Sequence, residues 1–172
     1  MSGEVVIVLR IFHIVGGALW VGSAIFYLLF VDPVVNLLGP AKPKFMQGLI
    51  EQRRYPLFMN AMSAFTIVAG ALLLWNTSGG LQGAWFQTRA GLGFTIGSVA
   101  ALLAYLVGFL MVRPRAGRMG ALGKQIGMTG GPPTPEQAAE LHKLEQELGT
   151  FGRLDAILLT IALVTMATAR YW

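Results

Sequence analysis

The sequence predicts an all-α integral membrane protein, a bundle of four helices that each cross the bilayer. Hydrophobic residues make up 55% of its 172 residues and charged residues only 12%, whereas soluble domains carry about 25% charged residues. The mean hydropathy of +0.62 agrees with this. The third observation is a set of four apolar stretches. Each is close to the roughly 20 residues that a helix needs to cross a hydrocarbon core of about 30 Å.

The four spans are expected to form a single membrane domain, residues 1–172. Helix breakers or charges bound them. Asp32-Pro33 is expected to end the first span, the polar run 76–80 the second, and Arg113-Pro114-Arg115 the third. The first stretch has no basic segment before it and is longer than the roughly 7–15 apolar residues of a signal peptide, so we interpret it as a retained helix. The predicted spans are 5–31, 55–75, 90–112 and 151–169.

Positive charge is concentrated in two predicted loops, 32–54 and 113–150. Together with Arg153 they hold ten of the thirteen Lys and Arg residues, whereas the loop between the second and third spans holds only Arg89. The positive-inside rule therefore places both basic loops in the cytoplasm and both termini outside. This asymmetry explains the net charge of +5 better than nucleic-acid binding does. Aromatic residues typical of membrane interfaces fall on the predicted outer side: Trp75, Trp85, Tyr171 and Trp172.

Each basic loop is expected to contain an amphipathic helical piece. In the first loop it covers 45–51 and lies on the inner membrane surface. In the second loop a helix is predicted to begin after the flexible run 130–133, because Thr134 is a candidate N-cap, Pro135 suits the first helical position and Gln137 completes a capping box. Leucines at 141, 144 and 148 follow at helical spacing. This amphipathic helix either lies on the inner membrane face or runs directly into the last span.

His13 is the residue within the spans that most suggests chemistry. It lies about eight residues from the outer end, roughly 12 Å deep, where ionisable residues are costly and usually functional. Gly16, Gly17 and Trp20 follow on the same side of the helix, so a flat strip of backbone is available for a planar macrocycle ligated by the imidazole. The alternative is a buried histidine that hydrogen-bonds a neighbouring helix, with the glycines allowing close helix packing.

Three arginines lie on the predicted outer side, and they are candidate partners for two carboxylates such as haem propionates. Arg10 is one turn from His13 on the same face, and the others are Arg89 and Arg170. Snorkelling from helix ends explains them equally well. The only other histidine, His142, falls in the second basic loop. A haem ligated by two histidines of one chain is therefore excluded, and the sixth position would be open or filled by methionine, water or a partner chain.

Copper is the second metal that the sequence suggests. Met59 and Met62 are one turn apart at the inner end of the second span, and Met111 ends the third span at a similar depth. Thioether sulfurs suit Cu(I), although methionine is also a common apolar filler. The absence of cysteine excludes disulfides and thiolate metal sites. Asp155, near the inner end of the last span, is expected to form a structural ion pair with Arg54, Arg113 or Arg153.

Several segments resemble known membrane proteins. The stretch 9–22, LRIFHIVGGALWVG, is similar to the first helix of the copper-resistance protein D-like family. The whole chain resembles a set of small bacterial four-helix membrane proteins in Arg53-Arg54, in Gly83-Ala84-Trp85, in GGPPTPE at 130–136 and in MATARYW at 166–172. This resemblance covers nearly the full length, and it implies a bacterial inner-membrane location.

A more distant resemblance is to the J-type protoporphyrinogen oxidases. Those four-helix membrane proteins are associated with haem b and have a histidine and a tryptophan early in their first helix, which His13 and Trp20 match. They also carry a lysine in their third helix, whereas the span 90–112 has no charge here. The resemblance implies haem b on His13, as an analogy of fold and motif.

These observations give one expected function and two alternatives. We expect a haem-b-binding or redox-associated protein embedded in the lipid bilayer, as an accessory subunit of a larger membrane complex or as a homo-oligomer. The alternatives are a structural or assembly subunit without a cofactor, and a component of a copper-handling permease. Whether the protein is an enzyme stays open, because the sequence shows no catalytic set of residues.

Overall fold

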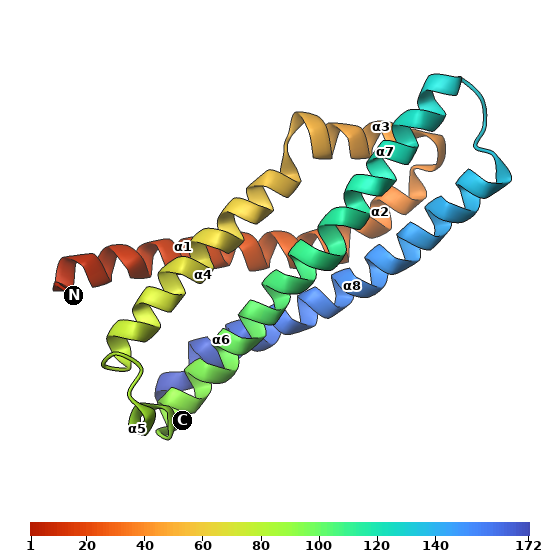
Figure 1. Ribbon diagram of the computed structural model, residues 1–172. Helices are drawn as coiled ribbons and strands as arrows, with labels where there is room; N and C mark the ends of the chain where they lie inside the picture. The colour runs from red at the N-terminus through yellow and green to blue at the C-terminus, as the bar shows by residue number, and fades with distance from the viewer.

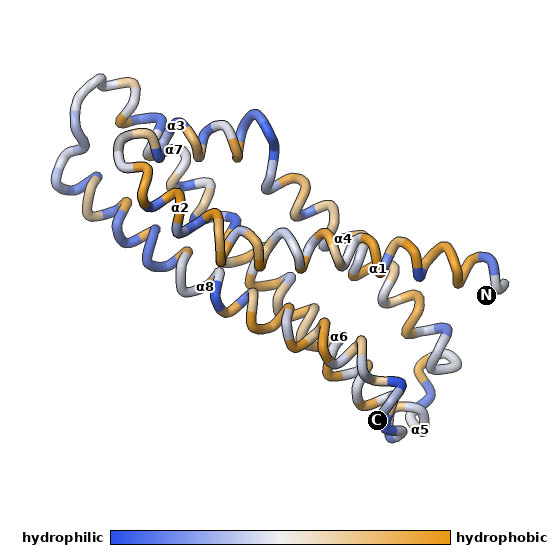
Figure 2. Tube along the Cα trace, turned by 180° about the vertical axis from the view of Figure 1, so that it is seen from behind, coloured by the Kyte–Doolittle hydropathy of each residue, from blue (hydrophilic) through white to orange (hydrophobic). Residues whose placement is uncertain are grey.

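The computed structural model describes the backbone of residues 1–172 and every side chain except that of Pro40, and it confirms the all-α fold. Both chain termini lie at one end of the bundle, here called the terminal end, together with the short helix α5 (Gly83–Phe86) (Figure 1). Residues 32–54 and 113–150 form the opposite, basic end. Figure 2 shows apolar spans and mostly hydrophilic residues at the basic end. Four helical segments are long and apolar enough to cross a membrane: Gly3–Leu37, Tyr55–Thr77, Arg89–Thr129 and Pro135–Tyr171.

The first spanning helix continues past the expected stop at Asp32-Pro33, so that prediction was wrong. It consists of α1 (Gly3–Phe26), η1 (Tyr27–Val31) and α2 (Asp32–Leu37). In η1 the backbone widens into a π turn, and the Asp32 N–H donates to the Tyr27 carbonyl five residues earlier. Proline normally ends a helix because it lacks an N–H and its ring clashes with the preceding turn. The wider turn accommodates Pro33, and the helix is not broken.

The third spanning helix passes Pro114 in the same way. It consists of α6 (Arg89–Val107), η4 (Gly108–Val112) and α7 (Arg113–Thr129). The Arg113 N–H donates to the Gly108 carbonyl across a second π turn. The expected end at residue 112 is therefore also wrong, and α7 extends this helix into the basic end.

The other two spanning helices begin where the sequence predicts a helix to start, the last of them at the start of the predicted amphipathic helix. Helix α4 (Tyr55–Thr77) follows Arg54, whose φ of 51° breaks the chain direction, and it ends before Gly79 and Gly80, both with positive φ. Helix α8 (Pro135–Thr168) starts with the predicted capping box, in which the Gln137 N–H lies 3.3 Å from Thr134 Oγ1. It runs unbroken into the last span and is followed by η5 (Ala169–Tyr171). The structure thus selects the second of the two alternatives for this helix.

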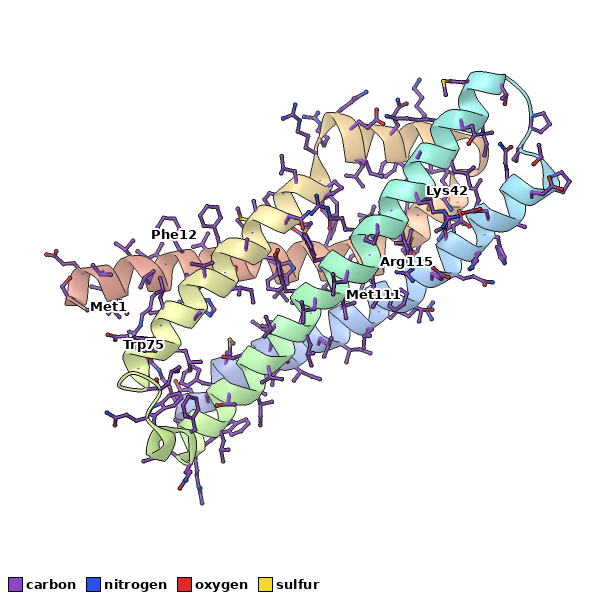
Figure 3. All side chains as sticks on the ribbon, viewed as in Figure 1. Met1, Phe12, Lys42, Trp75, Met111 and Arg115 are labelled. Carbon is purple, nitrogen blue, oxygen red and sulfur yellow. The ribbon has the colours of Figure 1, made fainter. Side chains whose placement is uncertain are left out.

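The first basic loop is helical and is tied to the second by ion pairs. Its elements are η2 (Gly39–Ala41), α3 (Lys42–Gln47) and η3 (Gly48–Gln52). Lys42 and Arg115 both reach α8 (Figure 3). The hydrogen bond from Lys124 holds the pKa of the Glu51 carboxyl below its ordinary value. Among the described residues, two ion pairs join the two loops, Lys42–Glu145 (2.5 Å) and Lys124–Glu51 (2.5 Å). Two more join α7 to α8 within the second loop, Arg115–Glu147 (2.6 Å) and Arg118–Glu140 (2.6 Å).

The bundle consists of two helix hairpins, α1 with α4 and α6 with α8, with fewer contacts between them. Their shared core is a small cluster of Trp20, Val21, Ala104 and Leu159. Small residues dominate the contact of α6 with α8 and η5, where Gly97 packs on Thr165 and Met166 of α8 and Gly93 packs on Ala169 of η5. Such residues let helices approach closely in a membrane, where lipid is as apolar as leucine and van der Waals packing holds helices together.

Candidate functional site

His13 lies on the face of α1 that packs against α4. Its Nδ1 is 2.9 Å from the backbone carbonyl oxygen of Thr66, and the side chain is partly buried. A carbonyl oxygen only accepts, so Nδ1 carries the hydrogen and donates it. In a neutral imidazole this leaves Nε2 with the lone pair. The contact therefore fixes both the orientation and the tautomer of the ring.

Gly70 provides the space that the His13 ring occupies. A Cβ built on Gly70 would lie 2.7 Å from His13 Cε1 and 2.9 Å from Nδ1. Any other residue at position 70 would therefore push the imidazole away from Thr66. Sequence reasoning missed both α4 positions. The sequence does mark Gly70, because an isolated glycine inside a helical pattern usually has a packing or functional reason.

The strip of Gly16, Gly17 and Trp20 faces protein. A Cβ on Gly16 would lie 2.8 Å from Thr66 Oγ1, and one on Gly17 would lie 3.5 Å from Thr66 Cγ2. Trp20 is only 5% exposed and belongs to the core cluster. The two glycines thus let α1 and α4 approach, and a flat group ligated by His13 would have to lie on another side of the ring.

Replacing Gly16 with alanine tests this close approach. The new methyl group meets Thr66 Oγ1, which is held by its own hydrogen bond of 2.8 Å to the Met62 carbonyl. We expect Gly16→Ala to lower the free energy of unfolding by about 1 kcal/mol, which thermal unfolding in detergent measures. Gly22→Ala is the matched control, because nothing lies within 4 Å of a Cβ there. Equal melting temperatures for the two variants would contradict the packing argument.

The three candidate arginines are divided between the two hairpins. Arg10 lies on α1 and is exposed. Arg89 begins α6 and Arg170 lies in η5, and these two elements pack on each other at the terminal end. The structure therefore brings Arg89 and Arg170 to one hairpin and leaves Arg10 beside His13 on the other.

The candidate copper residues occupy two kinds of environment. Met59 and Met62 pack against the core cluster around Trp20. Met111 lies on η4, and its sulfur is 3.7 Å from Nη1 of Arg115 one turn later. The first two methionines therefore belong to the bundle core, whereas Met111 lies beside Arg115.

Asp155 does not form the ion pair expected from the sequence, so that prediction was wrong. Within the part of the chain that the structure describes, its Oδ1 is the one buried side-chain oxygen or nitrogen without a hydrogen-bond partner. Of the expected partners, Arg113 is engaged elsewhere. Arg113 lies over the Phe109 ring at 5.1 Å from its centroid, and the nearby Tyr55 hydroxyl donates to the Ser23 carbonyl at 3.1 Å.

The acidic residues and histidines that could ligate a metal lie apart in the described part of the chain. Among the described residues no three of His, Asp and Glu come together as a metal-ligating group. His142, the second histidine, is exposed on α8 at the basic end, with Nε2 2.8 Å from Gln146 Nε2. No protein-family model, curated protein or solved structure matches the chain.

Proposed function

We propose that this protein binds haem b through His13 and acts as an accessory, redox-associated subunit in a bacterial inner membrane. The observation that carries the proposal is the hydrogen bond between His13 Nδ1 and the Thr66 carbonyl, 2.9 Å long. Histidines that ligate metals usually donate their second ring N–H to a carbonyl or a carboxylate, which fixes the ring and makes it a better ligand. The same bond leaves Nε2 available for iron.

A single histidine ligand such as His13 fits haem better than it fits a free metal ion. A tetrapyrrole brings four nitrogen ligands of its own, and the protein needs to add only one or two axial ligands. His13 supplies one such ligand from within an apolar span. A zinc or iron ion without a macrocycle would need three or more side chains, and the described residues hold no such group.

The surrounding residues have separate roles in this proposal. Gly70 and Thr66 hold the imidazole in place, and Arg10, three residues from His13 on the same helix, would bind a propionate. Arg89 and Arg170 lie on the other hairpin and would contribute only if the macrocycle reached between the hairpins. When bound, haem b would supply one-electron transfer at the iron.

An absorption spectrum of the detergent-solubilised protein, purified from cells supplied with haem precursor, tests the proposal. We expect a Soret band and one haem per chain in the wild type. His13→Ala should remove the band because it deletes the axial ligand. His142→Ala is the matched control, since it changes the only other histidine and lies at the opposite end of the bundle. It should leave the spectrum unchanged.

Two results would contradict haem binding at His13. One is a wild-type protein that stays colourless after reconstitution with hemin. The other is a His13→Ala variant that keeps its Soret band. Gly70→Ala gives an independent readout, because its methyl group displaces the ring without removing the ligand. We expect that variant to shift the band or weaken haem affinity while the helical content stays that of the wild type.

The accessory role rests on the apolar surface that α1 exposes. Helix α1 packs mainly on α4, and its Ile7, Ile11 and Ile14 side chains are 59%, 56% and 65% exposed. Such a face fits lipid or a neighbouring subunit. Native mass spectrometry after extraction in polymer nanodiscs is expected to show a second membrane protein or further copies of this chain. A monomer under all extraction conditions would contradict this role.

A further inference from the structure

A second feature of the spans lies far from His13, in a groove between the first helix and α8. Ile25 of α1 with Leu28 and Leu29 of η1 form one wall, and Ile157 and Ile161 of α8 belong to the other. The groove is open and has a volume of about 460 Å³. Ile25 is twelve residues from His13 along the helix, about 18 Å away. The groove is therefore separate from the proposed haem site, and a ligand could occupy it whether or not haem is bound at His13.

The groove has one charged residue, Arg153, at the end nearest the basic end. The α8 residues of this wall, at positions 153, 156, 157, 160 and 161, form one continuous face at helical spacing. Thr160 is the other polar side chain in the wall, and its hydroxyl donates to the Ala156 carbonyl at 2.7 Å. The ion pairs among the described residues all use other cations. The guanidinium of Arg153 is thus the one group in the groove that can recognise an anion.

The length of the groove along α8 is close to the thickness of one half of a bilayer. Eight residues separate Arg153 from Ile161, which is about 12 Å along α8. Half of a hydrocarbon core is about 15 Å thick. An acyl chain that follows the groove from Ile161 towards the basic end would therefore place its headgroup close to Arg153.

We propose that this groove binds one anionic phospholipid, with its acyl chain along the apolar wall and its phosphate on the Arg153 guanidinium. Arginine binds phosphate through two parallel hydrogen bonds, and basic pockets between spanning helices are recognised sites for anionic headgroups. A second copy of the chain fits less well. A helix packed into the groove would bury Arg153 against an apolar surface, and an unpaired buried charge is costly.

Native mass spectrometry of the protein in nanodiscs that contain phosphatidylglycerol and phosphatidylcholine with identical acyl chains tests the site. We expect the wild type to retain one phosphatidylglycerol in preference to phosphatidylcholine. Arg153→Gln should reduce that preference about fivefold, since one arginine near a headgroup contributes about that factor. Lys143→Gln is the matched control, an exposed cation ten residues earlier on α8, and it should leave the preference unchanged.

Ile157→Trp keeps the proposal falsifiable if Arg153→Gln folds poorly. It fills the groove and leaves Arg153 in place, so we expect it to displace the retained lipid whichever headgroup the lipid carries. Equal retention of the two lipids by the wild type would overturn the proposal, as would an unchanged preference in Arg153→Gln. A dimer that Ile157→Trp dissociates would also overturn it, by showing that a second copy occupies the groove.

Discussion

Gly97→Leu is expected to lower the free energy of unfolding by about 3 kcal/mol and the melting temperature by roughly 6–12 °C. A Cβ at position 97 would already lie 2.6 Å from Met166 Cγ, 2.8 Å from Thr165 Oγ1 and 3.3 Å from the Ala162 carbonyl. Met166 is flexible and can move, but the backbone of α8 cannot do so locally. A leucine must therefore push α6 and α8 apart along their closest contact.

The control for Gly97→Leu lies further along the same helical segment. Nothing lies within 4 Å of a Cβ built on Gly108, so Gly108→Leu adds the same apolar side chain and the same helix propensity without a clash. We expect its melting temperature to stay within a few degrees of the wild type. Thermal unfolding followed by circular dichroism in one detergent compares the three proteins. An equal fall in melting temperature in both variants would show that the α6–α8 contact is looser than the structure indicates.

The spans could be predicted from the sequence because their signal is long and local. Each apolar run is close to the length of a membrane crossing, and the capping box at Thr134 gives the start of α8 to the residue. The same local rules failed at Pro33 and Pro114. A proline ends an ordinary α-helix, but a π turn before each proline lets the helix continue, with N–H donors at Asp32 and Arg113 reaching carbonyls five residues back.

The site could be predicted only in part, because its second half comes from another helix. The sequence singles out His13 as an ionisable residue deep in a span. It does not give the partner of that ring, since the contacts with Thr66 and Gly70 depend on the relative rotation of α1 and α4. The glycines after His13 show the same limit. A small residue beside a histidine fits a bound macrocycle and a packed helix equally well, and Thr66 occupies that space here.

Asp155 shows that the tertiary structure can prevent an ion pair that the sequence suggests. Three arginines lie close enough in the sequence or topology to pair with it, yet within the described residues its Oδ1 is buried without a hydrogen-bond partner. A buried polar group with no partner costs about 1–3 kcal/mol, and a charged one costs more. The fold therefore retains a destabilising residue at this position. Such residues are common where function, and not stability, determines the choice of side chain.

Asp155→Leu is consequently expected to stabilise the protein, by about 2 kcal/mol and a melting temperature roughly 4–8 °C higher. Asp155→Asn keeps the volume and a polar group but removes the ionisable one. It should raise the melting temperature by less than Asp155→Leu does. Asp32→Leu is the control at another acidic position near the basic end, where no oxygen is buried without a partner among the described residues. Asp32→Leu should not raise the melting temperature. If Asp155→Leu instead lowers the melting temperature, the buried oxygen has a stabilising partner in the folded protein, and the argument from desolvation fails.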